Sequence, residues 1–140
     1  DVFGWDLGPS GCGAPQNYGL GKFNSAGAFP NIGFSGSNSL AAGNFEISLE
    51  TLIPFEPAQL FSGPASVTVP FFNGFRLVAF PIVRENLGPM DATGFRSVPV
   101  PITPAMVGTV RYYQFFYRDP AHPDGTSVGL TDGLMVEFCP

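Results

Sequence analysis

The sequence predicts an all-β protein, and within that class an antiparallel β-sandwich of the jelly-roll or immunoglobulin-like type with seven to nine short strands. Three observations favour this fold. Several short runs alternate apolar and polar residues with period two, which is typical of strands with one buried face. The 18 Gly and 15 Pro residues separate these runs, and no stretch has a long helical period. The 15 Phe and four Tyr residues argue against disorder, since disordered chains are poor in aromatic residues.

A chain of 140 residues corresponds to one domain. We divide it into an N-terminal strand with a Gly-rich connector, residues 1–20, and a β-sandwich, residues 21–140. The connector is the Gly- and Pro-rich stretch Gly8–Gly21, which we interpret as irregular structure. No internal repeat and no interior linker divides the chain further.

The first strand is expected at Asp1–Leu7. Phe3, Trp5 and Leu7 would share one face of this strand, and Val2 would lie on the other face. The strand either pairs within its own sandwich or is donated to a neighbouring copy of the chain, and the sequence does not decide between these two arrangements.

Three segments in the middle of the chain follow the same logic. Gly27–Phe34 is expected to form a short edge strand, because Pro30 cannot donate a hydrogen bond to a neighbouring strand. Asn44–Leu52 is the clearest amphipathic strand, with alternating apolar and polar residues. Ser66–Val69 is another short strand. Each segment would place one apolar face on a common core.

The next strands are separated by a turn and by prolines. Asn73-Gly74 predicts a tight turn, because both residues tolerate positive φ. Arg76–Val83 is almost wholly apolar, which favours a strand buried on both faces. Pro residues restrict Phe95–Ile102 to an edge strand, and Thr103–Gly108 is expected to form one helical turn.

The last thirty residues organise the sandwich. The aromatic strand Arg111–Arg118 is followed by a polar loop with turn residues and then by a strand at residues 134–138 with period-two alternation. We expect these two strands to lie centrally.

Composition excludes several classes of function. Charged residues make up only 12% of the chain, and the net charge is −5 with six Lys and Arg residues. Nucleic-acid binding requires a basic surface, which this composition does not supply. The same shortage of cations argues against docking on anionic lipid. No apolar run reaches the roughly 18 residues of a membrane-spanning helix.

The two cysteines predict a disulfide that ties the ends of the chain together. Cys12 and Cys139 lie at opposite ends of the sequence and would pair in an oxidising compartment. Two unpaired thiols, or bridges between chains, are the alternatives. The chain opens at Asp1 without a Met, and we interpret it as an exported, processed, extracellular or cell-surface protein.

Several motifs resemble a domain family found in secreted proteins of planctomycete-like and myxobacteria-like bacteria. The motifs are NSAGAFPNIGFSGSNSLAAGNFEISLE, PFFNGFRLVAFPIVR, RYYQFFYRDP and TDGLMVEFCP, and the resemblance runs from Asn24 to Pro140. The family often has Cys two residues after the N-G-F motif, whereas this chain has Leu77 there. The resemblance implies an exported β-sandwich without known enzymatic chemistry, and no catalytic residue is transferred by it.

Candidate catalytic and metal-binding residues are few. His122 is the only histidine, and Ser127 and Asp119 are near it in sequence, but a Pro- and Gly-rich turn would leave all three in solvent rather than in a catalytic triad. One His and two distant Cys residues cannot form a zinc site. Asp119, Asp124 and Asp132 could converge on calcium, although turn aspartates usually cap their own backbone. We therefore predict no enzyme, no metal and no cofactor, with calcium left open.

Two further sets of residues have a structural explanation that we prefer to a functional one. Glu46 and Glu50 would be about 13 Å apart on one strand face, too far for a retaining or inverting glycosidase pair, and we expect a solvated face. The aromatic strand offers a sugar-stacking platform only if one of its faces is exposed, and we expect both faces to be packed. Its rings are Tyr112, Tyr113, Phe115, Phe116 and Tyr117.

These observations predict a non-enzymatic extracellular structural protein, the subunit of a fibre, pilus-like filament or surface layer. Its partners would be copies of itself, joined by strand addition of the segment that contains Val2, Phe3, Trp5 and Leu7. A low-charge surface and spaced apolar anchors favour this hypothesis. The alternative is a carbohydrate- or cell-surface-binding β-sandwich module.

Overall fold

The computed structural model describes residues 12–140. Residues 1–11 lie outside the described residues, and with them the predicted strand of Val2, Phe3, Trp5 and Leu7. Among residues 12–140 no helix is long and apolar enough to cross a membrane. The elements of this part of the chain are, in order, β1 (Gln16–Tyr18), β2 (Asn31–Ser35), β3 (Glu46–Glu50), β4 (Pro57–Gly63), β5 (Ser66–Phe71), β6 (Gly74–Val78), β7 (Val83–Pro89), β8 (Phe95–Pro99), the 3₁₀ helix η1 (Pro104–Met106), β9 (Val110–Arg118), β10 (Val128–Leu130) and β11 (Gly133–Glu137).

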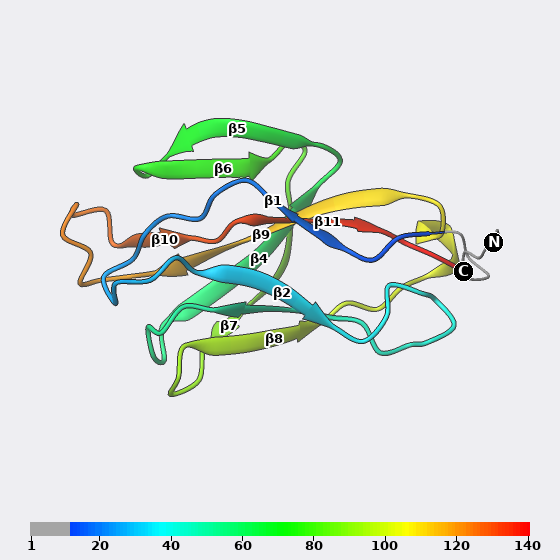
Figure 1. Cartoon of the computed structure of the whole chain (residues 1–140), viewed down its shortest axis with the longest axis horizontal. Coiled ribbons are helices and arrows are strands. Elements are labelled where there is room, and N and C mark those ends of the chain that lie inside the picture. Colours follow the sequence, from blue (N-terminus) through cyan, green and yellow to red (C-terminus); the bar gives the residue numbers. More distant parts are fainter. Residues whose placement is uncertain (1–11) are drawn as a thin grey trace.

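The strands form three antiparallel sheets (Figure 1). The six-stranded sheet has the order β1-β11-β9-β4-β7, and β10 pairs with the C-terminal end of β9. The three-stranded sheet has the order β2-β3-β8, and β5 and β6 form a separate hairpin. The predicted all-β antiparallel sandwich is confirmed. The predicted central position of the two C-terminal strands is confirmed as well, because β9 lies between β11 and β4.

The hydrophobic core lies between the six-stranded and the three-stranded sheets. β9 contributes three core-facing rings, Tyr113, Phe115 and Tyr117, and β3 contributes Ile47 and Leu49 from the opposite sheet; all five are buried. Each large apolar side chain buried in this way stabilises the fold by roughly 1.5–3 kcal/mol. The alternation along each strand leaves a second set of side chains on the outer face of the six-stranded sheet.

The β5–β6 hairpin forms a third layer on that outer face (Figure 1). Gln114 of β9 is fully buried beneath the hairpin. Its Nε2 donates to the carbonyl oxygens of Phe75 at 2.9 Å and Thr131 at 2.8 Å, and its Oε1 accepts from the backbone N–H of Leu77 at 2.9 Å. The Tyr18 hydroxyl donates to the Leu77 carbonyl at 2.6 Å. Side chains of the large sheet thus fasten the backbone of β6.

Several predicted elements are present with shifted ends. The strand expected at Asn44–Leu52 is the shorter β3, and the edge strand expected at Gly27–Phe34 is β2, which begins at Asn31 after Pro30. β8 is an edge strand of the three-stranded sheet, as its prolines predicted, and η1 is the expected helical turn. Local residue chemistry therefore located these elements to within a few positions.

Other predictions were wrong. Arg76–Val83 is not one doubly buried strand: β6 ends at Val78, and the chain then passes through the exposed Phe80 to β7. The sequence did not predict four of the strands, namely β1, β4, β7 and β10, so the expected count of seven to nine strands was too low. β1 falls within the supposedly irregular connector. β7 lacks an apolar alternation because most of its residues are exposed.

Candidate functional site

A groove of about 510 Å³ lies between the β5–β6 hairpin and the outer face of β4, β7 and β9. Its size falls within the range of roughly 300–1,000 Å³ that is typical of ligand-binding sites. Phe116 of β9, Phe61 of β4 and Leu87 of β7 line it from the sheet, and Phe71 and Phe72 line it from the hairpin. The groove is therefore a largely apolar surface between two layers of the fold.

Three of the aromatic rings that line this groove pack against one another. The ring centroids of Phe71 and Phe72 are 4.6 Å apart, and both lie about 6 Å from that of Phe116, at 6.0 and 5.9 Å. These separations are those of favourable edge-to-face and tilted aromatic pairs. The hairpin thus contributes rings to the site and does not merely cover the sheet.

Three arginines line the same groove, Arg76, Arg84 and Arg118. They are half of the six Lys and Arg residues of the chain, and no Asp or Glu lines the groove. Arg76 lies 4.4 Å from the ring centroid of Phe80, and Arg118 Nε donates to the Ser127 carbonyl at 3.3 Å. Among residues 12–140 none of the three forms an ion pair. The groove is consequently a positive, apolar site on an acidic protein and favours an anionic ligand with apolar groups.

The hairpin turn presents Phe72 in an unfavourable backbone conformation. The sequence predicted a turn centred on Asn73-Gly74, but the positive φ angles belong to Phe72 (48°) and Asn73 (60°), one residue earlier. Gly74 begins β6, where an added Cβ would approach side-chain atoms of Leu130 and Lys22 at 2.9 and 3.1 Å. A positive φ is a rare conformation for a bulky residue and marks strained backbone of the kind that occurs at functional sites.

β7 adds an open sheet edge beside the groove. It is the last strand of the six-stranded sheet, and within residues 12–140 no strand pairs with its outer side. Its seven residues make it the longest of the edge strands of this sheet and of the three-stranded sheet. Leu87 is 64% exposed and Val83 is 46% exposed. An unpaired edge with exposed apolar side chains is a template for pairing with another chain.

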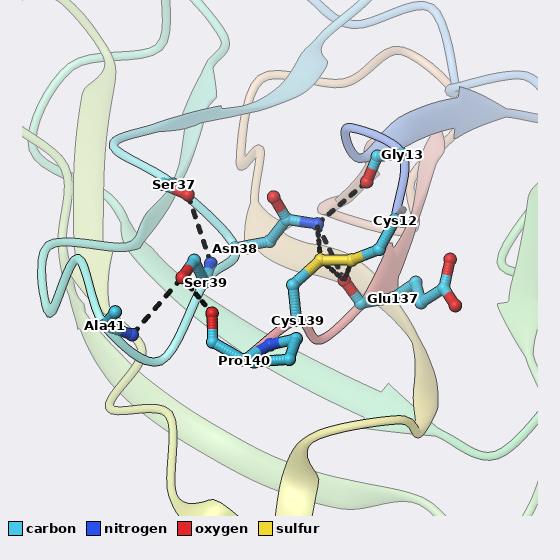
Figure 2. Close-up of a disulfide and its surroundings, with 9 residues drawn as sticks. All are labelled: Cys12, Gly13, Ser37, Asn38, Ser39, Ala41, Glu137, Cys139 and Pro140. Atoms are coloured by element: carbon cyan, nitrogen blue, oxygen red, sulfur yellow. Dashed lines mark hydrogen bonds between the residues drawn. A yellow bond between two sulfur atoms is a disulfide. The ribbon is translucent and has the colours of Figure 1, made fainter. Parts of the chain in front are cut away.

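The disulfide lies beside the last residue of the chain, Pro140 (Figure 2). Cys12 and Cys139, predicted to pair, form this disulfide with their Cα atoms 6.1 Å apart. The Asn38 side chain donates to the carbonyl oxygens of Gly13 at 2.9 Å and Glu137 at 2.7 Å, and the Cys139 N–H donates to the Asn38 carbonyl at 2.9 Å. The junction therefore fixes Cys12 beside the end of β11.

The structure does not assemble the candidate triad. His122 Nε2 lies 2.9 Å from the Phe23 carbonyl oxygen, and its Nδ1 accepts from the Asp124 backbone N–H at 3.1 Å. Among residues 12–140 neither ring nitrogen has a hydrogen bond to Ser127 or Asp119. The His122 ring is thus held between its own loop and the backbone of Phe23, which is a structural use of both nitrogens.

The three aspartates considered for calcium lie in separate hydrogen-bond networks. Asp119 is buried and accepts from the Ser25 N–H at 2.9 Å, whereas Asp124 pairs with Lys22 Nζ at 2.7 Å. Asp132 accepts from a backbone N–H of β2 at 2.9 Å, and burial raises its pKa. Within residues 12–140 no group of three or more His, Cys, Asp or Glu residues is placed to hold a metal ion. These carboxylates fasten loops to strands.

The ion pair between Asp124 and Lys22 predicts a pH dependence of stability. Burial opposes ionisation of Asp124, but hydrogen bonds from Lys22 and Thr126 outweigh this effect and hold its pKa well below the ordinary value. Because the pKa of the folded state is depressed, ionised Asp124 stabilises the fold above pH ~4, and this stabilisation is lost as the pH falls through the lowered pKa. Asp124→Asn should therefore be less stable than the parent at pH 6, with a difference that shrinks below pH 4.

Urea unfolding at pH 6, 4 and 2.5 measures this effect. Glu50→Gln is a suitable control, since Glu50 is exposed at the end of β3 and accepts no side-chain hydrogen bond within residues 12–140. An Asp124→Asn difference that stays constant over the three pH values would contradict the assignment.

Glu46, Glu50 and the aromatic strand β9 are the remaining features for which the sequence favoured a structural explanation. Glu46 accepts from Ser97 Oγ at 2.7 Å on the neighbouring strand, and Glu50 is exposed. The core-facing rings of β9 are enclosed, and burial raises the pKa of the Tyr113 and Tyr117 hydroxyls. On the outer face Tyr112 packs edge-on against the Tyr18 ring at 5.7 Å, so of the rings of β9 only Phe116 lines the groove.

A second hollow, of about 390 Å³, lies near the other side of the hairpin. Phe23, Phe29 and Phe75 line it together with the polar residues His122 and Asp124. The rings of Phe23 and Phe29 are 5.0 Å apart and largely exposed. This hollow combines aromatic surface with hydrogen-bonding groups.

The sequence analysis missed the groove residues. Arg76, Arg84 and Arg118 belong to three different strands, so no local spacing connects them. The available signal was that all five Arg residues of the chain occur in or beside the predicted strands. Only the topology shows that these strands meet around one groove.

Comparison with protein family models, with curated proteins and with solved structures found no match to this chain. The groove, the open edge of β7 and the exposed aromatic residues are the features of this chain that bear on its function.

Proposed function

We propose that this domain is a non-enzymatic extracellular structural protein that assembles with copies of itself into a filament or surface layer. The donor is the N-terminal segment with Val2, Phe3, Trp5 and Leu7, which joins a sheet of the next copy as an added strand. The observation that carries the proposal is the unpaired edge of β7 beside an apolar groove. A strand added to such an edge gains main-chain hydrogen bonds, and its alternate side chains fill neighbouring pockets.

The surface composition supports self-assembly. Charged residues are 12% of the chain, about half the usual share of soluble domains. The surface also exposes many Phe side chains, and exposed apolar patches are typical of interaction sites. The exposed Phe residues within residues 12–140 are Phe23, Phe29, Phe34, Phe55, Phe72, Phe75, Phe80 and Phe95.

The disulfide supports an extracellular location. Disulfides persist in oxidising compartments and are rare in the cytosol, and Cys12–Cys139 closes nearly the whole chain. The resemblance of the sequence motifs to a domain of secreted bacterial proteins supports the same location. Enzymatic chemistry is not part of the proposal, since both ring nitrogens of His122 contact backbone groups of Phe23 and Asp124.

Sedimentation velocity of the intact chain tests self-assembly. We expect a concentration-dependent distribution of polymers for the parent and a single monomeric species for the triple variant Phe3→Ser, Trp5→Ser, Leu7→Ser. The variant should retain the parent's urea midpoint, because the core and the interlayer hydrogen bonds described above all belong to residues 12–140. A parent that remains monomeric, or a triple variant that unfolds at lower urea, would instead favour pairing within one molecule or no assembly at all.

A second candidate function is recognition of a glycan at the hollow lined by Phe23, Phe29 and Phe75. Exposed aromatic rings beside hydrogen-bonding side chains favour it. A glycan array with the monomeric triple variant tests this candidate: binding that is lost on Phe29→Ser would support it, and absence of binding to any glycan would remove it.

A further inference from the structure

We infer that the groove between the β5–β6 hairpin and β7 is the acceptor site for residues 1–7 of a neighbouring copy of this chain. This inference rests on the proposed self-assembly and adds the location and chemistry of the contact. It assigns a function to the three groove arginines, to the strained Phe72 and to the open edge of β7.

Charge and apolarity of the two surfaces are complementary. The segment DVFGWDL has two carboxylates, Asp1 and Asp6, and no cationic side chain. The groove has three guanidinium groups and no lining carboxylate. Carboxylate–guanidinium contacts are directional and charge-assisted, and cations also stack well on a Trp face. An acidic aromatic segment therefore fits this groove better than any basic partner.

The length of the donor segment and the spacing of its apolar residues also fit β7 and the groove. Seven residues of extended chain match the seven residues of β7, both about 23 Å long at the ordinary rise of a strand. Phe3, Trp5 and Leu7 fall on one face of an extended segment, as the apolar side chains that line a groove must. Leu87 at the edge of the groove would lose its large exposure on contact with them.

The position of the disulfide favours donation to another copy. Cys12 is bonded to Cys139, which follows β11, and β7 lies three strands away across the sheet. Crossing three strands takes about 14 Å, and even the near end of β7 lies about 10 Å further along the sheet, because Val83 is level with Tyr113 whereas Glu137 pairs with Val110. The resulting direct distance of about 17 Å uses nearly the whole reach of the five residues from Leu7 to Cys12, about 18 Å fully extended. A neighbouring copy has no such restriction. Because donor and acceptor surfaces differ, the contact repeats head to tail and generates an open polymer.

A mixing experiment with two complementary full-length variants tests the inference. The donor-deficient chain has Phe3→Ser, Trp5→Ser and Leu7→Ser, and the acceptor-deficient chain has Leu87→Ser with Arg84→Glu, two exposed positions on β7. Each chain alone should sediment as a monomer. Their equimolar mixture should form a heterodimer of twice the monomer mass and nothing larger, because only one donor–acceptor contact remains possible.

Leu52→Ser provides the matched control, since Leu52 is 54% exposed but lies outside the groove; this variant should polymerise like the parent. Polymers formed by the acceptor-deficient chain would refute the groove assignment while leaving self-assembly intact. Two monomeric variants that fail to form a heterodimer would refute donation between copies. A parent chain that does not polymerise would overturn both the inference and the proposed function.

Discussion

Replacing Gln114 with Leu should lower the free energy of unfolding by about 4 kcal/mol. Gln114 is fully buried and makes three hydrogen bonds to backbone groups, two as donor and one as acceptor. Leu has a similar size, so the loss reports the unpaired N–H of Leu77 and the carbonyl groups of Phe75 and Thr131, each costing roughly 1–3 kcal/mol when buried without a partner. Urea unfolding of the monomeric triple variant, with and without Gln114→Leu, measures this difference.

The substitution should also affect assembly, because Gln114 fastens the hairpin that forms one wall of the groove. Gln59→Leu is the control for stability alone, because Gln59 also lines the groove. Gln59 lies half-buried on the same face of the sheet, and its amide donates to the carbonyl of the adjacent residue at 3.1 Å. We expect the control to change stability by less than about 1 kcal/mol, as surface substitutions usually do. A Gln114→Leu variant as stable as this control would contradict the three-layer description.

Removing the disulfide should lower the free energy of unfolding by about as much as Gln114→Leu does. Cys12 and Cys139 are separated by 127 residues in sequence, and a cross-link that closes so long a loop stabilises by about 4–5 kcal/mol in the chain-entropy model. We expect Cys12→Ser, Cys139→Ser to lose about 4 kcal/mol of unfolding free energy relative to the oxidised parent. Guanidinium unfolding with and without a thiol reductant measures it.

The reduced parent serves as the control for this prediction, because it keeps both cysteines but lacks the bond. The reduced parent and the double variant should have the same midpoint, well below that of the oxidised chain. If all three midpoints coincide, the disulfide does not constrain the ends of the chain.

The sequence identified the elements whose own residues carry a strong pattern. β9 is predicted by its run of aromatic residues and β11 by its period-two alternation, and their pairing buries Tyr113 and Leu134 at directly opposed positions. The Cys12–Cys139 pair was predicted from the count and the positions of the cysteines. These signals are local or depend on composition, and tertiary contacts did not override them.

The elements that were missed depend on their neighbours. β4 begins at Pro57, and a proline normally argues against a strand in the sequence around it, although proline is acceptable at the first position of a strand. β7 has no buried face that would impose an alternation, and β1 is only three residues long. The hairpin turn lies one residue earlier than predicted, because Gly74 is needed for close packing rather than for positive φ.

The candidate site was even less accessible to sequence analysis. Arg76, Arg84 and Arg118 lie on three strands that the fold brings together, and no motif spacing reports this arrangement. The chemistry of the donor segment, two carboxylates among large apolar residues, can be read directly from the sequence. What the structure added is a groove of opposite charge beside an unpaired strand.

Hydrogen–deuterium exchange on the amides of residues 83–88 shows whether the edge of β7 accepts a strand from a neighbouring copy. We expect the outward-facing amides of β7 to exchange slowly in the assembled parent and rapidly in the monomeric triple Ser variant, while the amides of β9 are equally protected in both. Equal exchange of β7 in the two proteins, at concentrations where the parent is polymeric, would contradict this expectation.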